Sequence, residues 1–186
     1  EKDAVFLEQG FDSLRELGIG GTAIGTGVNA PHGFSGKGVK HLSKETSIEF
    51  RVTRDKIDLT RNANDFTHAS ASLRNLAITL VRISNDLKLM ASGPKAGFNE
   101  ITLPEVEPGS SIMPGKVNPS VPECVEMIGL QVIGLDSVIA SCASRGQLGL
   151  NTTTPLIAFN LLHSLKILTN GQRILRECVQ GMQANE

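Results

Sequence analysis

The chain has 186 residues, enough for one domain with a sizeable buried core. Its formal net charge of −1 excludes the basic surface that attracts nucleic acids or anionic membranes. No apolar run approaches the roughly 20 residues that a membrane span needs, so we expect no membrane association. The chain has 7 Phe, no Trp and no Tyr, so the core must be aliphatic, which suits long packed helices.

The first half of the chain reads as three helices with a glycine-rich loop after the first. Apolar residues from Val5 to Leu17 have helical spacing, and six glycines between Gly18 and Phe34 predict a loop. A shorter helix is predicted over 35–47. From Leu59 to Met90 apolar positions recur at alternating steps of three and four, the spacing of a helix-packing seam. This helix would be roughly 50 Å long.

Two further seams follow, over Val121–Cys142 and Leu161–Met182. Thr154-Pro155 suits the start of the last helix, since Thr caps the free N–H groups and Pro is favoured at the first helical position. Helices this long need partners along their length. We therefore predict an all-α fold, a long-helix bundle formed by residues 1–186 as a single partial domain, and an oligomer. The chain opens without Met inside a helical pattern, so we expect a fragment of a larger protein.

Cysteine and histidine show no pattern typical of a metal or disulfide site. Cys124, Cys142 and Cys178 are odd in number, far apart and inside apolar helical patterns. They are predicted to be buried free thiols in a reducing compartment, so we expect a cytoplasmic protein. The four histidines lack metal-ligand spacing with each other or with cysteine, and we expect no metal and no cofactor.

The segment Gly109–Pro119 reads Gly-Ser-Ser-Ile-Met-Pro-Gly-Lys-Val-Asn-Pro and has the strongest functional pattern. Lys116 precedes a helix start, with either Asn118-Pro119 or Ser120 and Glu123 as the capping pair. A lysine beside free N–H groups and a positive helix end is unfavourable unless an anion joins them. The sequence therefore suggests a carboxylate or phosphate site, although a plain connector with a surface lysine has the same composition.

Ser110 and Ser111 in this segment are candidates for proton transfer or hydrogen bonding. Serine is a weak base unless positive charge and N–H donors stabilise its alkoxide, and this segment offers both. Glu123 has two interpretations: a helix-capping residue, or a carboxylate that orients a histidine elsewhere. The run Gly20–Asn29 superficially resembles a phosphate loop but lacks the required lysine order, so it is either a polar loop facing a site or a simple turn.

The segment Gly109–Pro119 resembles the signature Gly-Ser-Ser-x-Met-Pro-x-Lys-x-Asn-Pro of the fumarase/aspartase superfamily at every defined position. Gly21–Asn29, Ser92–Gly97 and Gly146–Asn151 are also similar to segments of that family, in the same order. The resemblance implies the second half of a central helical domain that tetramerises, with each active site shared by three subunits. It also implies anti-elimination from a small dicarboxylate, aspartate or malate, to give fumarate.

By position, the resemblance implies roles for individual residues. Ser110 would be the catalytic base, and Ser111, Lys116, Val117 and Asn118 would bind substrate. Glu123 would pair with a catalytic histidine. In the family, the other signature regions come before the part that this chain resembles, and no residue here matches them. We therefore expect this chain alone to be inactive.

The branch of the family is less clearly indicated. Asn99-Glu100-Ile101 and Gly146-Gln147 look more like aspartases, whereas Asn29–Phe34 leans toward class II fumarases. We favour deamination of L-aspartate, with hydration of fumarate as the alternative. Argininosuccinate and adenylosuccinate lyases fit less well because of Gly115 and Val117. A non-catalytic helical assembly module is a further alternative, against which the intact signature argues.

Overall fold

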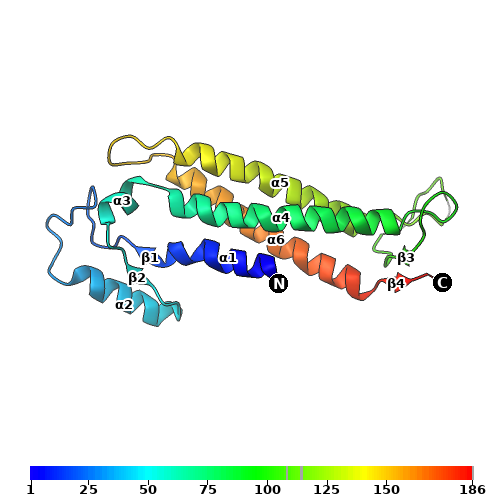
Figure 1. The fold of residues 1–186 in the computed structure, drawn as a ribbon, viewed down its shortest axis with the longest axis horizontal. Helices are drawn as coiled ribbons and strands as arrows, with labels where there is room; N and C mark the ends of the chain where they lie inside the picture. Colours follow the sequence, from blue (N-terminus) through cyan, green and yellow to red (C-terminus); the bar gives the residue numbers. More distant parts are fainter. Residues whose placement is uncertain (108, 114, 186) are drawn as a thin grey trace. The chain divides into compact units, whose positions relative to one another are not determined.

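The computed structural model describes residues 1–107, 109–113 and 115–185. Its helices confirm the all-α prediction (Figure 1). The helices are α1 (Lys2–Asp12), the 3₁₀ turn η1 (Ser13–Arg15), α2 (Phe34–Thr46), α3 (Lys56–Arg61), α4 (Asn64–Met90), α5 (Ser120–Ala143) and α6 (Thr154–Gln180). The strands are β1 (Glu16–Leu17), β2 (Arg51–Val52), β3 (Ile101–Thr102) and β4 (Gln183–Ala184).

The sequence pattern did not predict the strands. In one pair β1 runs parallel to β2, with Glu16 opposite Arg51. In the other, β3 runs antiparallel to β4, with Ile101 opposite Ala184 (Figure 1). Each strand has two residues, which is too short to show the alternation by which a strand is recognised in a sequence.

Two predicted helices are shorter than their apolar patterns. The first ends at Asp12 instead of reaching Leu17, because the chain passes through η1 into β1. The predicted helix over 59–90 is interrupted between α3 and α4. The Asn62 N–H still donates to the Asp58 carbonyl at 2.8 Å, as in a helix, but its own backbone angles are extended. This conformation ends α3 before the longer helix begins.

The described residues group into two compact units. One comprises Glu1–Leu73 and Leu135–Leu162; the other comprises Arg74–Gly134 and His163–Glu186, of which the last residue is outside the described range. Helices α4, α5 and α6 each contribute to both units. The single-domain organisation and the bundle therefore stay predictions, and each unit is described by itself below.

The first unit is held by a close helix contact and by polar pairs. Gly10 on α1 lies against Ser72 on α4, so closely that a Cβ on residue 10 would stand 2.6 Å from the Ser72 Cβ. The buried Ser70 hydroxyl donates to the Asp136 carboxylate at 2.6 Å. The Arg51 guanidinium donates to Asp12 at 2.8 Å, and this hydrogen bond lowers the pKa of the Asp12 carboxyl.

The second unit has an aliphatic core along the predicted seams. Leu76, Leu80 and Leu87 of α4 are buried, as are Val125 and Val132 of α5 and Leu168 and Leu175 of α6. Three other predicted seam positions, Ile83, Gln172 and Val179, are exposed, so the prediction is wrong there. The adjacent residues Ser84, Gly171 and Cys178 are buried instead. A helix turns by 3.6 residues, so the buried stripe drifts away from a strict seven-residue pattern.

The three cysteines are free, as predicted. Cys142 and Cys178 are buried and Cys124 is half-buried, so the prediction of buried thiols is confirmed for two of them. Burial raises the pKa of the Cys178 thiol, which keeps it in the protonated, unreactive form.

Helix α5 is more apolar than we expected. It has 24 residues, and an 18-residue stretch of it has a mean hydropathy of 1.5, so by length and composition it is able to cross a membrane, contrary to the sequence expectation. Core helices of water-soluble proteins meet the same criterion. Only 33% of that stretch is buried within this chain, and Met127 and Leu130 are among its exposed residues.

Helix contact in the second unit depends on Gly129. A Cβ there would stand 2.4 Å from the Val81 side chain and 3.1 Å from the Ala77 carbonyl, so we expect Gly129→Ala to force α4 and α5 apart. The substitution should lower the free energy of unfolding by about 1–3 kcal/mol, measured for this chain by urea denaturation.

Gly134→Ala is the matched control, because it lies on the same helix with nothing within 4 Å of the added Cβ. It should be neutral or stabilising, since Ala favours helix. Equal effects of the two substitutions would contradict the close contact at Gly129.

Candidate functional site

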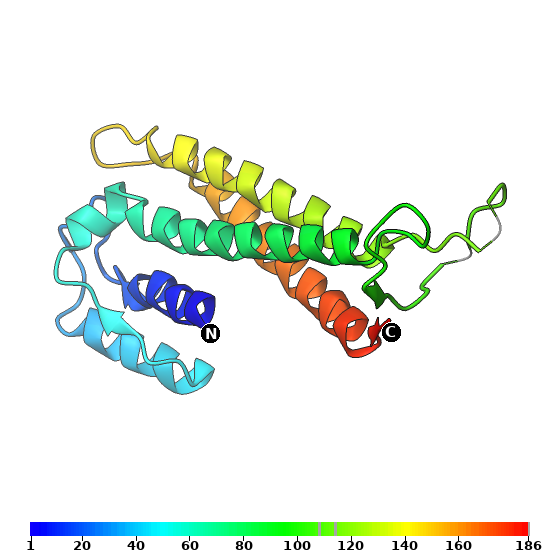
Figure 2. The same ribbon diagram turned by 45° about the vertical axis from the view of Figure 1, so that its right-hand side comes forward.

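The signature segment, residues 109–119, connects the chain after β3 to the start of α5. Figure 2 shows the connection between α4 and α5 extending beyond the helix ends that it joins. Gly109 lies against the far end of the segment, because a Cβ there would stand 2.6 Å from the Lys116 carbonyl oxygen. Only glycine allows this approach, which brings residues 109 and 116 of the segment together. Pro114, within the signature, is outside the described residues.

A turn sets the position of Lys116. The Lys116 N–H donates to the Met113 carbonyl at 3.2 Å, and Gly115 has a φ of +78°. This left-handed conformation suits glycine, and open space surrounds the position where a Cβ would stand. Two different reasons therefore explain the two glycines of the segment: the backbone angle at Gly115 and close packing at Gly109.

The Ser110 side chain accepts two backbone hydrogen bonds within the signature segment. Its Oγ accepts hydrogen bonds from the N–H groups of Ile112 at 3.3 Å and Met113 at 3.2 Å. Donors that point at an oxygen stabilise its negative form, so these two bonds lower the free-energy cost of forming an alkoxide there. Ser110 is half-buried, whereas its neighbour Ser111 is exposed.

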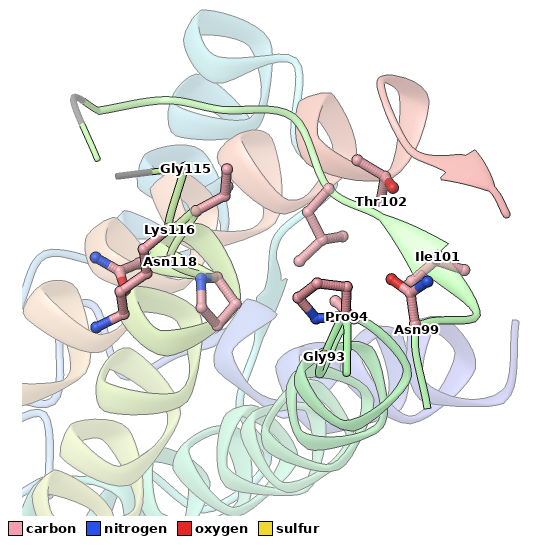
Figure 3. Close-up of a pocket in the computed structure, with 12 residues that line it drawn as sticks. Gly93, Pro94, Asn99, Ile101, Thr102, Gly115, Lys116 and Asn118 are labelled. Atoms are coloured by element: carbon pink, nitrogen blue, oxygen red, sulfur yellow. The ribbon is translucent and has the colours of Figure 1, made fainter. Parts of the chain in front are cut away.

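A cavity of about 500 Å³ lies beside the end of the signature segment. Figure 3 shows Lys116 and Asn118 on one side of it, Asn99, Ile101 and Thr102 on the other, and Gly93 and Pro94 between them. The remaining residues that line it are Ala91, Leu103, Gly115, Val117 and Pro119. The cavity thus has a cation and two amides among small and aliphatic residues, a composition suited to a small anion.

The start of α5 adds to this electrostatic character. The helix begins at Ser120, directly after the cavity-lining Pro119, and its 24 residues place a positive dipole end there. An anion between this helix end and Lys116 would be stabilised by both. The second unit contains all of these groups.

Neither predicted capping pair describes the start of α5. The helix begins two residues after Asn118. The Glu123 N–H donates to the Pro119 carbonyl at 3.0 Å, an ordinary first-turn helical bond, and the Ser120 hydroxyl donates to Glu107. Glu123 is exposed on the first turn, where a carboxylate is favoured by the helix dipole.

The structure brings together part of the predicted site. Lys116, Val117 and Asn118 line the cavity, but Ser110, Ser111 and Glu123 are absent from its described lining. The roles assigned to those three residues stay predictions, as does the pairing of Glu123 with a histidine. Within the described residues, no group of three His, Cys, Asp or Glu side chains is arranged to hold a metal ion.

The cavity wall opposite Lys116 includes residues that the sequence did not assign to the site. Asn99 and Thr102 lie there because the chain after α4 folds back on itself. Ser92 anchors this fold: its carbonyl accepts from the Asn99 N–H at 2.7 Å and its hydroxyl accepts from the Phe98 N–H at 3.1 Å. The only available signal was the clustering of glycine and proline at 92–97, which predicts a turn without its direction.

The glycine-rich run Gly20–Asn29 belongs to the first unit and closes on itself. The Gly27 N–H donates to the Gly21 carbonyl at 2.8 Å, and Gly25 lies so close to α3 that a Cβ would stand 2.4 Å from the Ile57 backbone. These contacts explain the glycines structurally and favour the turn interpretation of this run.

Comparison with known proteins identifies relatives across the chain. A family model described as Lyase matches residues 7–134. The chain is 43% identical to aspartate ammonia-lyase of Bacillus subtilis (strain 168) over 187 aligned residues, which covers 100% of the chain and 39% of that protein. It is 46% identical to fumarate hydratase class II of Prochlorococcus marinus (strain MIT 9313), with 96% and 39% coverage.

A solved structure agrees with these matches. The crystal structure of recombinant class II fumarase from Schistosoma mansoni superposes with a TM-score of 0.96 at 35% identity. The superposition covers 99% of this chain and 42% of the fumarase chain. The chain thus spans about two fifths of the length of the relatives that it matches.

Proposed function

Because the chain belongs to the lyase family, we propose that it forms the carboxylate-binding part of an enzyme that eliminates ammonia from L-aspartate to give fumarate. The observation on which this proposal rests is the signature segment. It holds Ser110 with two N–H donors on its Oγ, and it places Lys116 and Asn118 at a cavity beside a helix N-terminus. These are a candidate base and an anion site on one short stretch of chain.

In the proposed reaction, the Ser110 alkoxide removes a proton from the carbon next to a substrate carboxylate. The electron pair of the broken C–H bond moves into that carboxylate, which becomes a doubly charged aci-carboxylate. When this intermediate collapses, the C–C double bond of fumarate forms and the C–N bond breaks, so that ammonia leaves with its electron pair. The two N–H donors on Ser110 Oγ make the alkoxide accessible.

Lys116, Asn118 and the start of α5 take the role of stabilising the extra charge on the carboxylate. A positive side chain, an amide and a helix dipole all favour the aci-carboxylate over the singly charged ground state, which is the condition for catalysis. Val117 is the apolar residue between the two ligands, and Ser111 adds a further hydrogen-bonding group to the substrate.

Fumarate hydration to L-malate is the alternative function. Relatives with both names match the chain at similar identity, 43% and 46%, so the similarity supports either reaction. The two reactions share the base and the carboxylate site and differ in how the leaving group is held. The aspartase-like segment Asn99-Glu100-Ile101 is the reason to place aspartate first, and Asn99 and Ile101 both line the cavity.

The direct test is an assay of the full-length protein that contains this chain, with L-aspartate and L-malate as separate substrates and fumarate absorbance as the measurement. Fumarate from L-aspartate supports the proposal, and fumarate from L-malate alone supports the alternative. If neither substrate gives fumarate with correctly folded protein, the proposed function is wrong.

Ser110→Ala in that protein should reduce kcat by about 10²–10⁴-fold, because it removes the base while leaving the carboxylate ligands in place. The measurement is the initial rate of fumarate formation, with circular dichroism and the oligomeric state as checks on folding. Turnover close to that of the unsubstituted protein would exclude Ser110 as the base.

Lys116→Met should weaken binding of a dicarboxylate such as succinate by about 10–100-fold, the effect of losing one charge-assisted hydrogen bond. Isothermal titration calorimetry measures this directly. Lys40→Met, at an exposed lysine on α2, is the matched control and should leave the affinity unchanged. Equal affinity in both variants would argue against an anion site at Lys116.

We also propose that the protein acts as a cytoplasmic homotetramer. The exposed apolar side chains of α5, including Met127 and Leu130, support association, and the free cysteines are compatible with a reducing compartment. Sedimentation velocity of the full-length protein should give a tetramer. A monomer across the micromolar range would contradict the assembly.

A further inference from the structure

Asn185, near the end of the chain, is bonded to the wall of the cavity opposite Lys116. Its Nδ2 donates to the Asn99 carbonyl oxygen at 2.9 Å and to the Asn99 Oδ1 at 3.3 Å. Its Oδ1 accepts from the Thr102 hydroxyl at 2.8 Å, and its backbone N–H donates to the Glu100 carbonyl at 2.9 Å. One residue thus uses its backbone N–H and both polar ends of its side chain on a single stretch, residues 99–102.

The residues that Asn185 holds are residues of the cavity. Asn99 and Thr102 both line it, with Ile101 between them on β3 (Figure 3). Strand β4 pairs with β3 directly before Asn185, with Thr102 opposite Gln183. Gly181 lies against Pro104, where an added Cβ would stand 3.3 Å from the proline ring. The stretch 181–185 therefore runs alongside residues 99–104, which include the cavity wall.

The backbone of Asn99 shows why the wall needs this support. Its φ is +53°, in the left-handed region that is unfavourable for residues other than glycine, although Asn tolerates it better than most. Such a conformation persists when surrounding bonds hold it. Here the Asn99 N–H is bonded to Ser92 and its carbonyl and side-chain oxygens to Asn185. Asn99 is therefore held at two points, by Ser92, which precedes it in the sequence, and by the side chain of Asn185, which follows it by 86 residues.

We propose that Asn185 is a positioning residue for the carboxylate site, which sets substrate affinity by holding the Asn99–Thr102 wall in place across from Lys116 and Asn118. This inference rests on the proposed function, because it assigns the cavity to the substrate. Asn185 makes no described bond to the signature segment that contains Ser110. Loss of its side chain should therefore affect binding more than the proton-transfer step.

The test is Asn185→Ala in the full-length protein, with kcat and KM measured for the substrate that gives fumarate. KM should rise about three- to tenfold while kcat stays within about twofold, as expected when two or three hydrogen bonds that position a binding wall are lost. Asn185→Asp keeps the acceptor for Thr102 but loses the donor to Asn99. It should raise KM nearly as much, because Asn99 is the strained member of the wall.

Thr102→Val gives an independent measure of the same contact, since it removes the hydroxyl donor at nearly constant volume. In the double variant with Asn185→Ala, the rise in KM should be no larger than in Asn185→Ala alone, because both substitutions remove one shared bond. Gln183→Ala is the matched control: Gln183 is exposed on β4, two residues before Asn185, and its backbone pairing with Thr102 is retained. It should leave both kcat and KM unchanged.

A purely structural role for Asn185 predicts a different result. It would lower the melting temperature and the active fraction, and hence the apparent kcat, with KM unchanged; that outcome would overturn the inference. Independent, additive effects of Thr102→Val and Asn185→Ala on KM would overturn it as well. If the unsubstituted protein forms fumarate and Asn185→Ala has the same KM, only this inference fails. If the unsubstituted protein forms no fumarate from either substrate, the proposed function fails first.

Discussion

Aliphatic packing between long helices is the constraint on which the rest of the structure depends. Without Trp or Tyr, the core consists of Leu, Ile, Val, Ala and Cys side chains, which fill space only where helices approach closely. Gly129 permits such an approach between α5 and α4, and Gly171 permits one between α6 and α5. Helices packed in this way must be long and continuous, so irregular backbone is confined to the connections between them.

Among the described residues of the connection from Met90 to Ser120, only Leu103 is buried, and local backbone contacts determine the path of the chain there. Gly109 allows its backbone to lie against the Lys116 carbonyl, and Ser92 binds the returning chain at Phe98 and Asn99. Both contacts act at short range, but together they leave a cavity between the two arms of the connection. One arm ends at the positive end of α5 and brings Lys116 and Asn118 to the cavity.

The resulting site has one side well defined for an anion. Lys116, the helix end and the two N–H donors on Ser110 are all suited to negative charge, the first two on a ligand and the last on the serine itself. This combination is the one that proton removal beside a carboxylate requires. Groups that would hold a leaving ammonia or water are a separate need. Under the proposed function, this chain, which spans about two fifths of the length of its relatives, contributes the carboxylate side of the site.

The sequence by itself determined the long helices, the class of fold and the identity of the signature segment. These depend on local information: helical periodicity over 24 to 27 residues, helix-ending glycine and proline, and a contiguous motif. Tertiary structure decided the two-residue strands and the opposite wall of the cavity. The bonds from Asn185 to Asn99 and Thr102 join residues 86 and 83 positions apart, and nothing in either local pattern specifies that pairing. The sequence could place Lys116 and Asn118 beside a helix start, whereas only the folded chain shows what lies across from them.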